Sequence, residues 1–382
     1  MEQPAPGKQD ISNPRACSDK DGLLMEQPAL GKPDICNFRA CSNKDGLLTC
    51  SRCKFVKYCC RDCQIKDVSG HKGLCRNIAK LKGAVEEAAE PLRTAEENWF
   101  ETRVGDFHLY YDTGRYMSSI VKLRDEVCLH AISIKTAGTA QLWEVCLKHC
   151  LEPMRLSSLK YDMCNQVPFL LLLIGSRDDD VVDYCCYWIR VDLEEEVDNI
   201  NRNSFREGDW IFPRQEDSRF LDILEQFPKL GSGLVSGSCV FLFALWMVKM
   251  RLVSSLQAKI LSSNNGPADD LQAVIEKQQR QADKLMERIM EFENLLGHGP
   301  FATIRAYPTP FHEKSLPQKV FRGTLDHPKE VWQSLCSVCL ERSSFFEDWV
   351  KENISTKEIL HNFVRDRRDE HLAANHLAQQ KK

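Results

Sequence analysis

Seven cysteines and one histidine lie within forty residues of this chain, in four pairs that have the spacing of metal ligands. The pairs are Cys36-x4-Cys41, Cys50-x2-Cys53, Cys59-x3-Cys63 and His71-x3-Cys75. Zinc prefers thiolate and imidazole ligands, and two ligands a few residues apart form half of a four-coordinate structural site. Four pairs therefore predict two complete sites, or two Zn²⁺ per chain. Reduced cysteines of a hydrophobic core would not be spaced as four ligand pairs with a histidine.

The same segment, residues 36–75, resembles the MYND-type zinc finger. The resemblance rests on Tyr58-Cys59, Cys63-Gln64, His71-Lys72 and Cys75. In that family the pairs interleave, which implies one zinc held by Cys36, Cys41, Cys59 and Cys63 and another held by Cys50, Cys53, His71 and Cys75. The resemblance also implies that the finger binds short, often Pro-containing peptides of partner proteins, through Gln64 and the exposed face around Val68. Family members often have a tryptophan at the position of Val68, and its absence weakens the expectation of a peptide groove.

One ligand position has two candidates. Cys60 and Cys63 have the generic Cys-x2-Cys spacing, so Cys60 competes with Cys59 for the ligand role. We favour Cys59, because Tyr58-Cys59 matches the family. Cys60 is then a spare thiol or a supporting group beside the metal site.

The N-terminal part of the chain contains a tandem duplication. Residues 1–24 and 25–48 are near-copies that differ at five positions. The first copy has Ser12 where the second has Cys36, and no Cys-x2-Cys follows Leu24. The first copy therefore cannot complete a zinc site, and residues 1–35 are predicted to form a polar, disordered tail. A chain that started at Met25 would still carry every ligand.

Composition predicts an intracellular protein with a sizeable folded part. A chain of 382 residues with 43% hydrophobic content can build a substantial core beside a small zinc module. The polar N-terminal residues lack the basic and apolar segments of a secretory signal. The eighteen cysteines are therefore expected to be reduced thiols and metal ligands, in the cytoplasm or the nucleus.

The cysteine-rich segment is locally basic. Residues 36–82 contain eleven Lys or Arg against three Asp or Glu. Seven thiolates outweigh the charge of two Zn²⁺, so basic neighbours are expected for charge compensation alone. Nucleic-acid binding would also need a recognition helix or a platform of stacking aromatics, and the sequence shows neither. It remains the alternative to peptide binding.

A mainly α-helical domain is predicted over residues 76–299. The expected helices are 77–104, broken or kinked at Pro91, and 115–135, 139–151, 165–174 and 178–191. Three aspartates, Asp178 to Asp180, suit a helix N-terminus. The segment from Val167 to Trp188 resembles MYND-finger proteins of fungi, whose helical region has no assigned activity. That resemblance implies a related fold but no function.

Two later segments are predicted to be helices. Residues 230–248 carry no charge, but only Cys239–Val248 is densely apolar, which favours a core helix over a membrane crossing of about twenty residues. No membrane partner is expected. Apolar residues from Leu271 to Leu296 follow a four-three spacing, as in a coiled coil or in a helix packed on its own domain. We favour the packed helix, because Gln278 and Ala282 weaken the seam.

The remaining segments are predicted from their composition. Residues 300–320 form a Pro-rich loop, and residues 321–382 form a helical region with a charged tail. Cys336-x2-Cys339 lacks a second pair, and the set Cys146, His149 and Cys150 lacks partners, so we expect core residues rather than metal or redox sites.

No enzyme motif is visible. The sequence has no phosphate-binding Gly-rich loop followed by Lys, no Gly-x-Ser-x-Gly and no His-Glu-x-x-His. Some MYND fingers are embedded in SET-domain lysine methyltransferases, but Asn375-His376 lacks the cysteine that follows in a SET core. We therefore predict a nonenzymatic zinc-binding module that binds partner proteins. The alternative is a nucleic-acid-binding or transcription-associated regulator that uses the basic finger.

Overall fold

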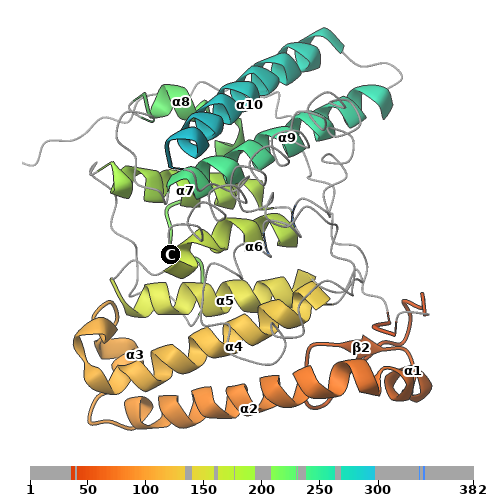
Figure 1. The fold of residues 1–382 in the computed structure, drawn as a ribbon, viewed down its shortest axis with the longest axis vertical. Coiled ribbons are helices and arrows are strands. Elements are labelled where there is room, and N and C mark those ends of the chain that lie inside the picture. The colour runs from red at the N-terminus through yellow and green to blue at the C-terminus, as the bar shows by residue number, and fades with distance from the viewer. Residues whose placement is uncertain are drawn as a thin grey trace, which may run out of the picture.

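The protein consists of a small cysteine-rich N-terminal part and a stack of helices (Figure 1). The computed structural model describes residues 36–38, 41–133, 140–158, 162–175, 177–193, 208–228, 230, 238–262, 268–296, 335 and 339. The predicted tail (1–35) and Pro-rich loop (300–320) lie outside these residues, as does the C-terminal region (321–382) except for Leu335 and Cys339. The mainly α-helical fold class is confirmed.

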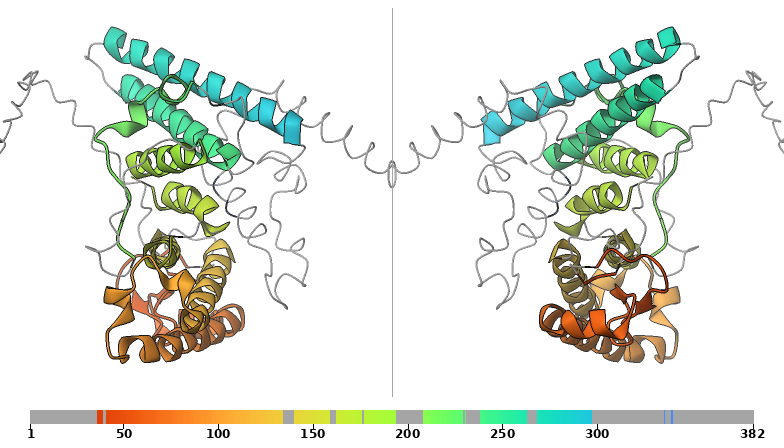
Figure 2. Two further views of the ribbon diagram at one scale, coloured as in Figure 1. Left: turned by 90° about the vertical axis from the view of Figure 1, so that its left-hand side faces the viewer. Right: turned by 90° about the vertical axis from the view of Figure 1, so that its right-hand side faces the viewer.

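The strands and α-helices are β1 Leu48–Thr49, β2 Lys57–Tyr58, α1 Arg61–Lys66, α2 Val68–Arg93, α3 Trp99–Thr102, α4 Gly114–Ser133, α5 Ala140–Leu156, α6 Val167–Ile174, α7 Asp178–Asp192, α8 Ile223–Gln226, α9 Ser238–Ser262 and α10 Ala268–Leu296. Short 3-10 turns are η1 Phe107–Leu109, η2 Tyr111–Thr113, η4 Asp162–Asn165 and η5 Ser218–Phe220. The long helices pack in chain order, α2 on α4, then α5, α6, α7, α9 and α10. Figure 2 shows this elongated stack from two further sides, with α2 and α10 at opposite ends.

The first long helix crosses the predicted boundary between the finger and the helical domain. Helix α2 begins at Val68 and continues through residue 75 to Arg93, two residues beyond Pro91. Proline has no N–H for the helical hydrogen-bond ladder, and the chain starts a new helix only at Trp99. Pro91 lies inside α2, so the helix is not broken at the proline as expected but ends two residues later, at Arg93. The division into a finger and a separate helical domain stays a prediction.

Apolar residues gather in the central layers of the stack. Helix α6 is apolar along its whole length, and its residues from Val167 to Leu172 are buried. It packs against α5, α7 and α9, so most of its surface is covered by other helices. A helix that is hydrophobic all round belongs in the core of a larger fold.

Helices α9 and α10 close the far end of the stack. Among the described residues, α9 is the one helix long and apolar enough to cross a membrane, and 83% of its most apolar window is buried inside the protein. It packs on α7 and α10. Helix α10 buries Ile275, Ala282, Leu285 and Ile289, so the expected amphipathic helix packed on its own domain is confirmed.

The three aspartates that begin α7 tie this helix to distant segments. Asp178 pairs with Arg251 of α9 at 2.7 Å, and Asp179 pairs with Arg219 of η5 at 3.1 Å. Asp180 binds both Arg177 at 2.6 Å and Arg214 at 2.7 Å. The predicted helix N-terminus is confirmed. Its carboxylates offset the helix dipole and also form ion pairs with other segments.

A buried lysine joins α9 to its neighbours. The Lys249 ammonium donates to the carbonyl oxygens of Arg219 and Leu221 at 2.8 and 2.7 Å, and to Gln278 Oε1 at 2.8 Å. Burial lowers the pKa of this ammonium to about 8, so the group is still mostly charged at neutral pH. Its three protons therefore have three acceptors, as a fully buried cation requires.

Replacing Lys249 should destabilise the far end of the stack. Lys249→Met removes the donor of one buried and two partly buried hydrogen bonds, and we expect the free energy of unfolding to fall by about 3 kcal/mol. Urea unfolding of the purified chain measures this loss. Lys284→Met, at an exposed lysine of α10, is the matched control and should be nearly neutral. Equal stability of the two variants would contradict the role given to Lys249.

Candidate metal centre

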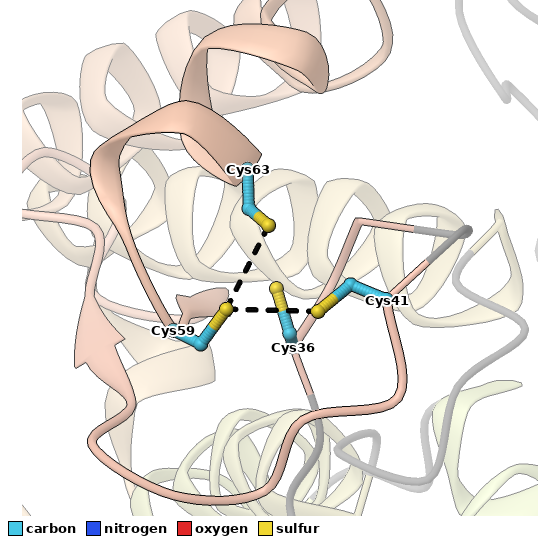
Figure 3. Close-up of side chains that lie close together, drawn as sticks. All are labelled: Cys36, Cys41, Cys59 and Cys63. Carbon is cyan, nitrogen blue, oxygen red and sulfur yellow. Dashed lines mark hydrogen bonds between the residues drawn. The ribbon is translucent and has the colours of Figure 1, made fainter.

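Two loops and the first short helix bring four cysteine sulfurs together. Cys36 and Cys41 lie in the N-terminal loop, Cys59 follows β2, and Cys63 lies in α1. The loop is fixed by backbone hydrogen bonds from Cys36 N to Asn43 O and from Asn37 N to Lys57 O, at 2.9 and 2.8 Å. The four sulfurs point towards a common centre (Figure 3). We call this quartet the outer site, because three of its cysteines are only partly buried.

The second quartet joins the strand pair to helix α2. Strands β1 and β2 are antiparallel, with Leu48 opposite Tyr58. The turn between them carries Cys50 and Cys53. Its backbone is closed by Cys50 N to Val56 O at 2.8 Å and Lys54 N to Cys50 O at 3.0 Å.

Helix α2 supplies the other half of this site. His71 and Cys75 stand one turn apart on α2, so their side chains lie on the same face. We call the quartet Cys50, Cys53, His71 and Cys75 the inner site, because all four residues are buried.

The distances between ligand atoms match tetrahedral zinc. Zn–S bonds of about 2.3 Å and Zn–N bonds of about 2.0 Å place two sulfurs about 3.8 Å apart, and a sulfur and a nitrogen about 3.5 Å apart. In the outer site, Cys59 Sγ lies 3.6 Å from Cys41 Sγ and 3.6 Å from Cys63 Sγ. In the inner site the matching distances are Cys50 Sγ to Cys75 Sγ 3.9 Å, Cys53 Sγ to His71 Nε2 3.6 Å and Cys50 Sγ to His71 Nε2 3.5 Å. Both donor sets therefore fit a zinc ion.

Protonation in the inner site also suits a metal. Burial lowers the pKa of His71, against a smaller opposing effect of Asp67, and this favours the neutral imidazole that binds zinc. Burial raises the pKa of the Cys75 thiol to about 12, with further increases from Cys53 and Cys50. Zinc has to displace that proton, so its binding releases protons to solvent.

An aspartate holds the segments between the two sites. The carboxylate of Asp67, at the junction of α1 and α2, accepts hydrogen bonds from Tyr58 Oη and Asn37 Nδ2, both at 2.7 Å. Tyr58 is buried, and its ring contacts the edge of the His71 ring at 6.0 Å between centroids. One carboxylate thus connects the N-terminal loop, β2 and the start of α2.

The inner site is packed against the helical stack. The His71 ring lies 5.6 Å from the ring of His130 on α4, which is buried. Burial, together with His71, lowers the pKa of His130 to about 4, so both rings are neutral at physiological pH. Lys82 of α2 donates to the Cys53 carbonyl oxygen at 3.2 Å, and its ammonium lies 4.1 Å from the centre of the Phe55 ring.

Comparison with known families agrees with this geometry. Residues 36–75 match the family model described as MYND finger. This segment is a MYND finger. No curated protein and no solved structure matches the chain. The match covers the finger alone, so the expected kinship of residues 167–188 with fungal MYND-finger proteins stays a prediction.

The MYND finger has two interleaved tetrahedral sites for two Zn²⁺, as expected. The structure groups the same eight residues into the same two sets that the resemblance implied, and it places Cys59 rather than Cys60 in the outer quartet. The Cys60 side chain is exposed, with its Sγ 3.9 Å from Cys59 Sγ. Gln64 and Val68 are exposed, and their role in partner binding stays a prediction.

Sequence reasoning missed two residues that position the ligands, Asp67 and His130. Asp67 carries no motif signal beyond its place between Cys63 and His71. His130 lies 59 positions after His71, and only packing brings the two rings together.

The other cysteines considered from the sequence behave as core residues. Cys146 and Cys150 are buried in α5, and within the described part of the chain only the two finger quartets could hold a metal ion. Cys336 lies outside the described residues. Cys339 is buried, and its thiol donates to the Phe169 carbonyl oxygen at 3.5 Å.

Removing one inner ligand should cost one zinc. Cys53→Ser is expected to reduce the zinc content from two ions to one per chain, because three ligands hold the ion much less tightly. The finger should become sensitive to protease while the helical circular dichroism signal largely persists. Cys60→Ser, at an exposed cysteine outside both quartets, is the control and should keep two ions. Unchanged zinc content in Cys53→Ser would refute the ligand set.

Deleting the duplicated segment should leave metal binding intact. A chain without residues 1–24 keeps all eight ligands, so its zinc content should stay at two ions per chain. Elemental analysis of the truncated and full-length proteins under reducing conditions makes the comparison. A lower content in the truncated chain would mean that the first copy supplies a ligand.

Proposed function

We propose that the MYND finger binds short peptides of partner proteins, and that the chain acts as a nonenzymatic interaction module in the cytoplasm or nucleus. The observation that carries this proposal is the set of exposed apolar side chains on the finger. Leu48, Ile65 and Val68 are 69%, 57% and 43% exposed, although five of the eight zinc ligands of the finger are buried. Exposed apolar groups on a rigid metal-stabilised scaffold are typical of a binding surface.

The scaffold under these residues is well fixed. Backbone hydrogen bonds from Gln64 N to Cys60 O, Asp67 N to Cys63 O and His71 N to Asp67 O make the α1–α2 junction nearly continuous. Gln64 and Val68 are four residues apart on this junction, a spacing that places side chains on one helical face. Val68 offers an apolar contact, and the Gln64 amide beside it can donate and accept hydrogen bonds. Together they would suit a peptide that has apolar side chains and backbone polar groups.

The alternative, nucleic-acid binding, has weaker support. Some basic groups of the finger region have internal contacts, such as Lys82 with the Cys53 carbonyl and Lys66 over the Phe38 ring at 5.9 Å. Others compensate the negative charge that seven thiolates leave on two Zn²⁺. The basic composition is therefore explained without a phosphate ligand.

Two features of the helical stack favour a role without catalysis. The side chains with the most strongly raised pKa values, such as Tyr184 and Cys185, are fully buried in the stack, where a substrate has no access. The buried ion pair of Arg155 and Glu152 is used for packing, since Glu152 also accepts from Gly208 N and Arg155 donates to the Phe100 carbonyl oxygen. Perturbed groups at a catalytic site would instead lie in an accessible cleft.

Selection of peptides by the zinc-loaded protein tests the proposal. We expect a display library of short, proline-rich peptides to be enriched on the intact chain, and the selected peptides to bind Val68→Asp at least about tenfold more weakly, since a charge replaces an apolar contact. Leu261→Asp is the matched control, because Leu261 is 86% exposed on α9 at the other end of the stack. Its affinity should equal that of the unmodified protein.

The same experiment separates the two functions. Single-stranded RNA and duplex DNA oligonucleotides are offered in parallel at low and physiological salt. Binding that falls steeply with salt and ignores Val68→Asp would favour the nucleic-acid alternative. Failure to enrich any peptide, or equal losses in Val68→Asp and Leu261→Asp, would contradict the peptide-binding surface.

A further inference from the structure

The two zinc sites differ sharply in their surroundings. The inner ligands are at most 7% exposed, and the helical stack packs against them. In the outer site only Cys36 is fully buried, while Cys41, Cys59 and Cys63 are partly open to solvent. An incoming ligand can approach the outer metal position, whereas the inner one is enclosed by protein.

A fifth sulfur lies beside the outer site. Cys60 Sγ is 3.9 Å from Cys59 Sγ. Two sulfurs bound to one tetrahedral zinc are about 3.8 Å apart, which is nearly the same distance. It is the exposed cysteine among the free cysteines that the structure describes. The structure thus has five thiols at a site where four are needed.

The position of Cys60 on the backbone suits a ligand. Cys60 is the N-cap residue of α1, in extended conformation, and its side chain makes no capping hydrogen bond. Cys63 is three residues further, in the first turn of the same helix. Cys60 and Cys63 therefore have the Cys-x2-Cys spacing of a zinc half-site.

We propose that Cys60 replaces Cys59 as a ligand of the outer zinc, and that this exchange makes the outer ion transferable to thiol or chelating acceptors. In the exchange, the Cys60 sulfur loses its proton and bonds to zinc, while the Zn–S bond to Cys59 breaks and the Cys59 sulfur takes up a proton. Zinc stays Zn²⁺, and no oxidant or reductant takes part.

The exchange lowers the number of bonds that must break together. A four-thiolate site without a neighbouring sulfur has to lose a ligand outright before an acceptor can bind. A fifth thiol 3.9 Å from the Cys59 sulfur lets Cys59 leave while Cys60 binds the ion, and an acceptor can bind during this exchange. The inner site has no exposed cysteine beside it among the described residues, so its ion stays in place.

Metal transfer from the intact chain tests the exchange without reference to any partner. The protein is loaded with cadmium, whose NMR signal distinguishes an all-sulfur site from one with an imidazole ligand, and is then mixed with a competing chelator under reducing conditions. We expect the all-sulfur signal to be lost first. In Cys60→Ser, which keeps all eight ligands, we expect its loss to be slower by roughly tenfold, in the range that groups beside a metal typically exert.

A second variant examines the replacement itself. Cys59→Ser should keep two zinc ions per chain, because Cys60 completes the outer site, whereas the double variant Cys59→Ser with Cys60→Ser should keep one. Transfer from Cys60→Ser at the unmodified rate would overturn the proposal. Loss of the outer ion in the single Cys59→Ser variant, equal to that in the double variant, would overturn it as well.

Discussion

The inner metal site, through His71 and Cys75, ties the first long helix to the strand pair of the finger. Both ligands lie on α2, which then runs through residue 75 to Arg93 and packs on α4. Forty residues have too little apolar surface to fold alone, and zinc supplies on the order of 10–16 kcal/mol in small modules of this kind. Because the ligands are part of a long helix, that free energy also orients the helix on which the stack is built.

Only the inner site has ligands on α2, so the two metal sites stabilise different parts of the protein. The inner ion lies between the strand pair, α2 and the His130 ring of α4, so it supports the junction of finger and stack. The outer ion closes the N-terminal loop onto β2 and α1, next to solvent. The exposed side chains of Ile65 and Val68 follow the last outer ligand, Cys63, so the proposed peptide-binding surface and the more accessible metal site lie on the same short segment.

Much of this arrangement was predictable from the sequence, and the rest depended on contacts that leave no local pattern. Ligand spacing predicted two sites, the resemblance implied how the pairs cross, and apolar periodicity predicted most long helices. Asp67, His130 and Lys249 were missed because their partners are brought near only by the fold, from segments up to 59 residues away. The boundary at residue 75 followed the end of the metal motif, but ligand spacing carries no information about where a helix ends.

In the layers far from the finger, around α7, α9 and α10, hydrogen bonds and ion pairs fix how the helices pack. Layers of apolar helices such as α6 and α9 tolerate shifts in packing, since many arrangements bury similar areas. Lys249 does not tolerate a shift, because three acceptors from two different segments have to surround its ammonium. The pairs of Asp178 with Arg251 and of Asp179 with Arg219 add two further fixed distances between α7 and its neighbours. Buried charges of this kind contribute little net stability, and a misplaced one costs several kcal/mol. They therefore select one register among the arrangements that apolar packing alone would allow, as the zinc ligands do at the other end of the stack.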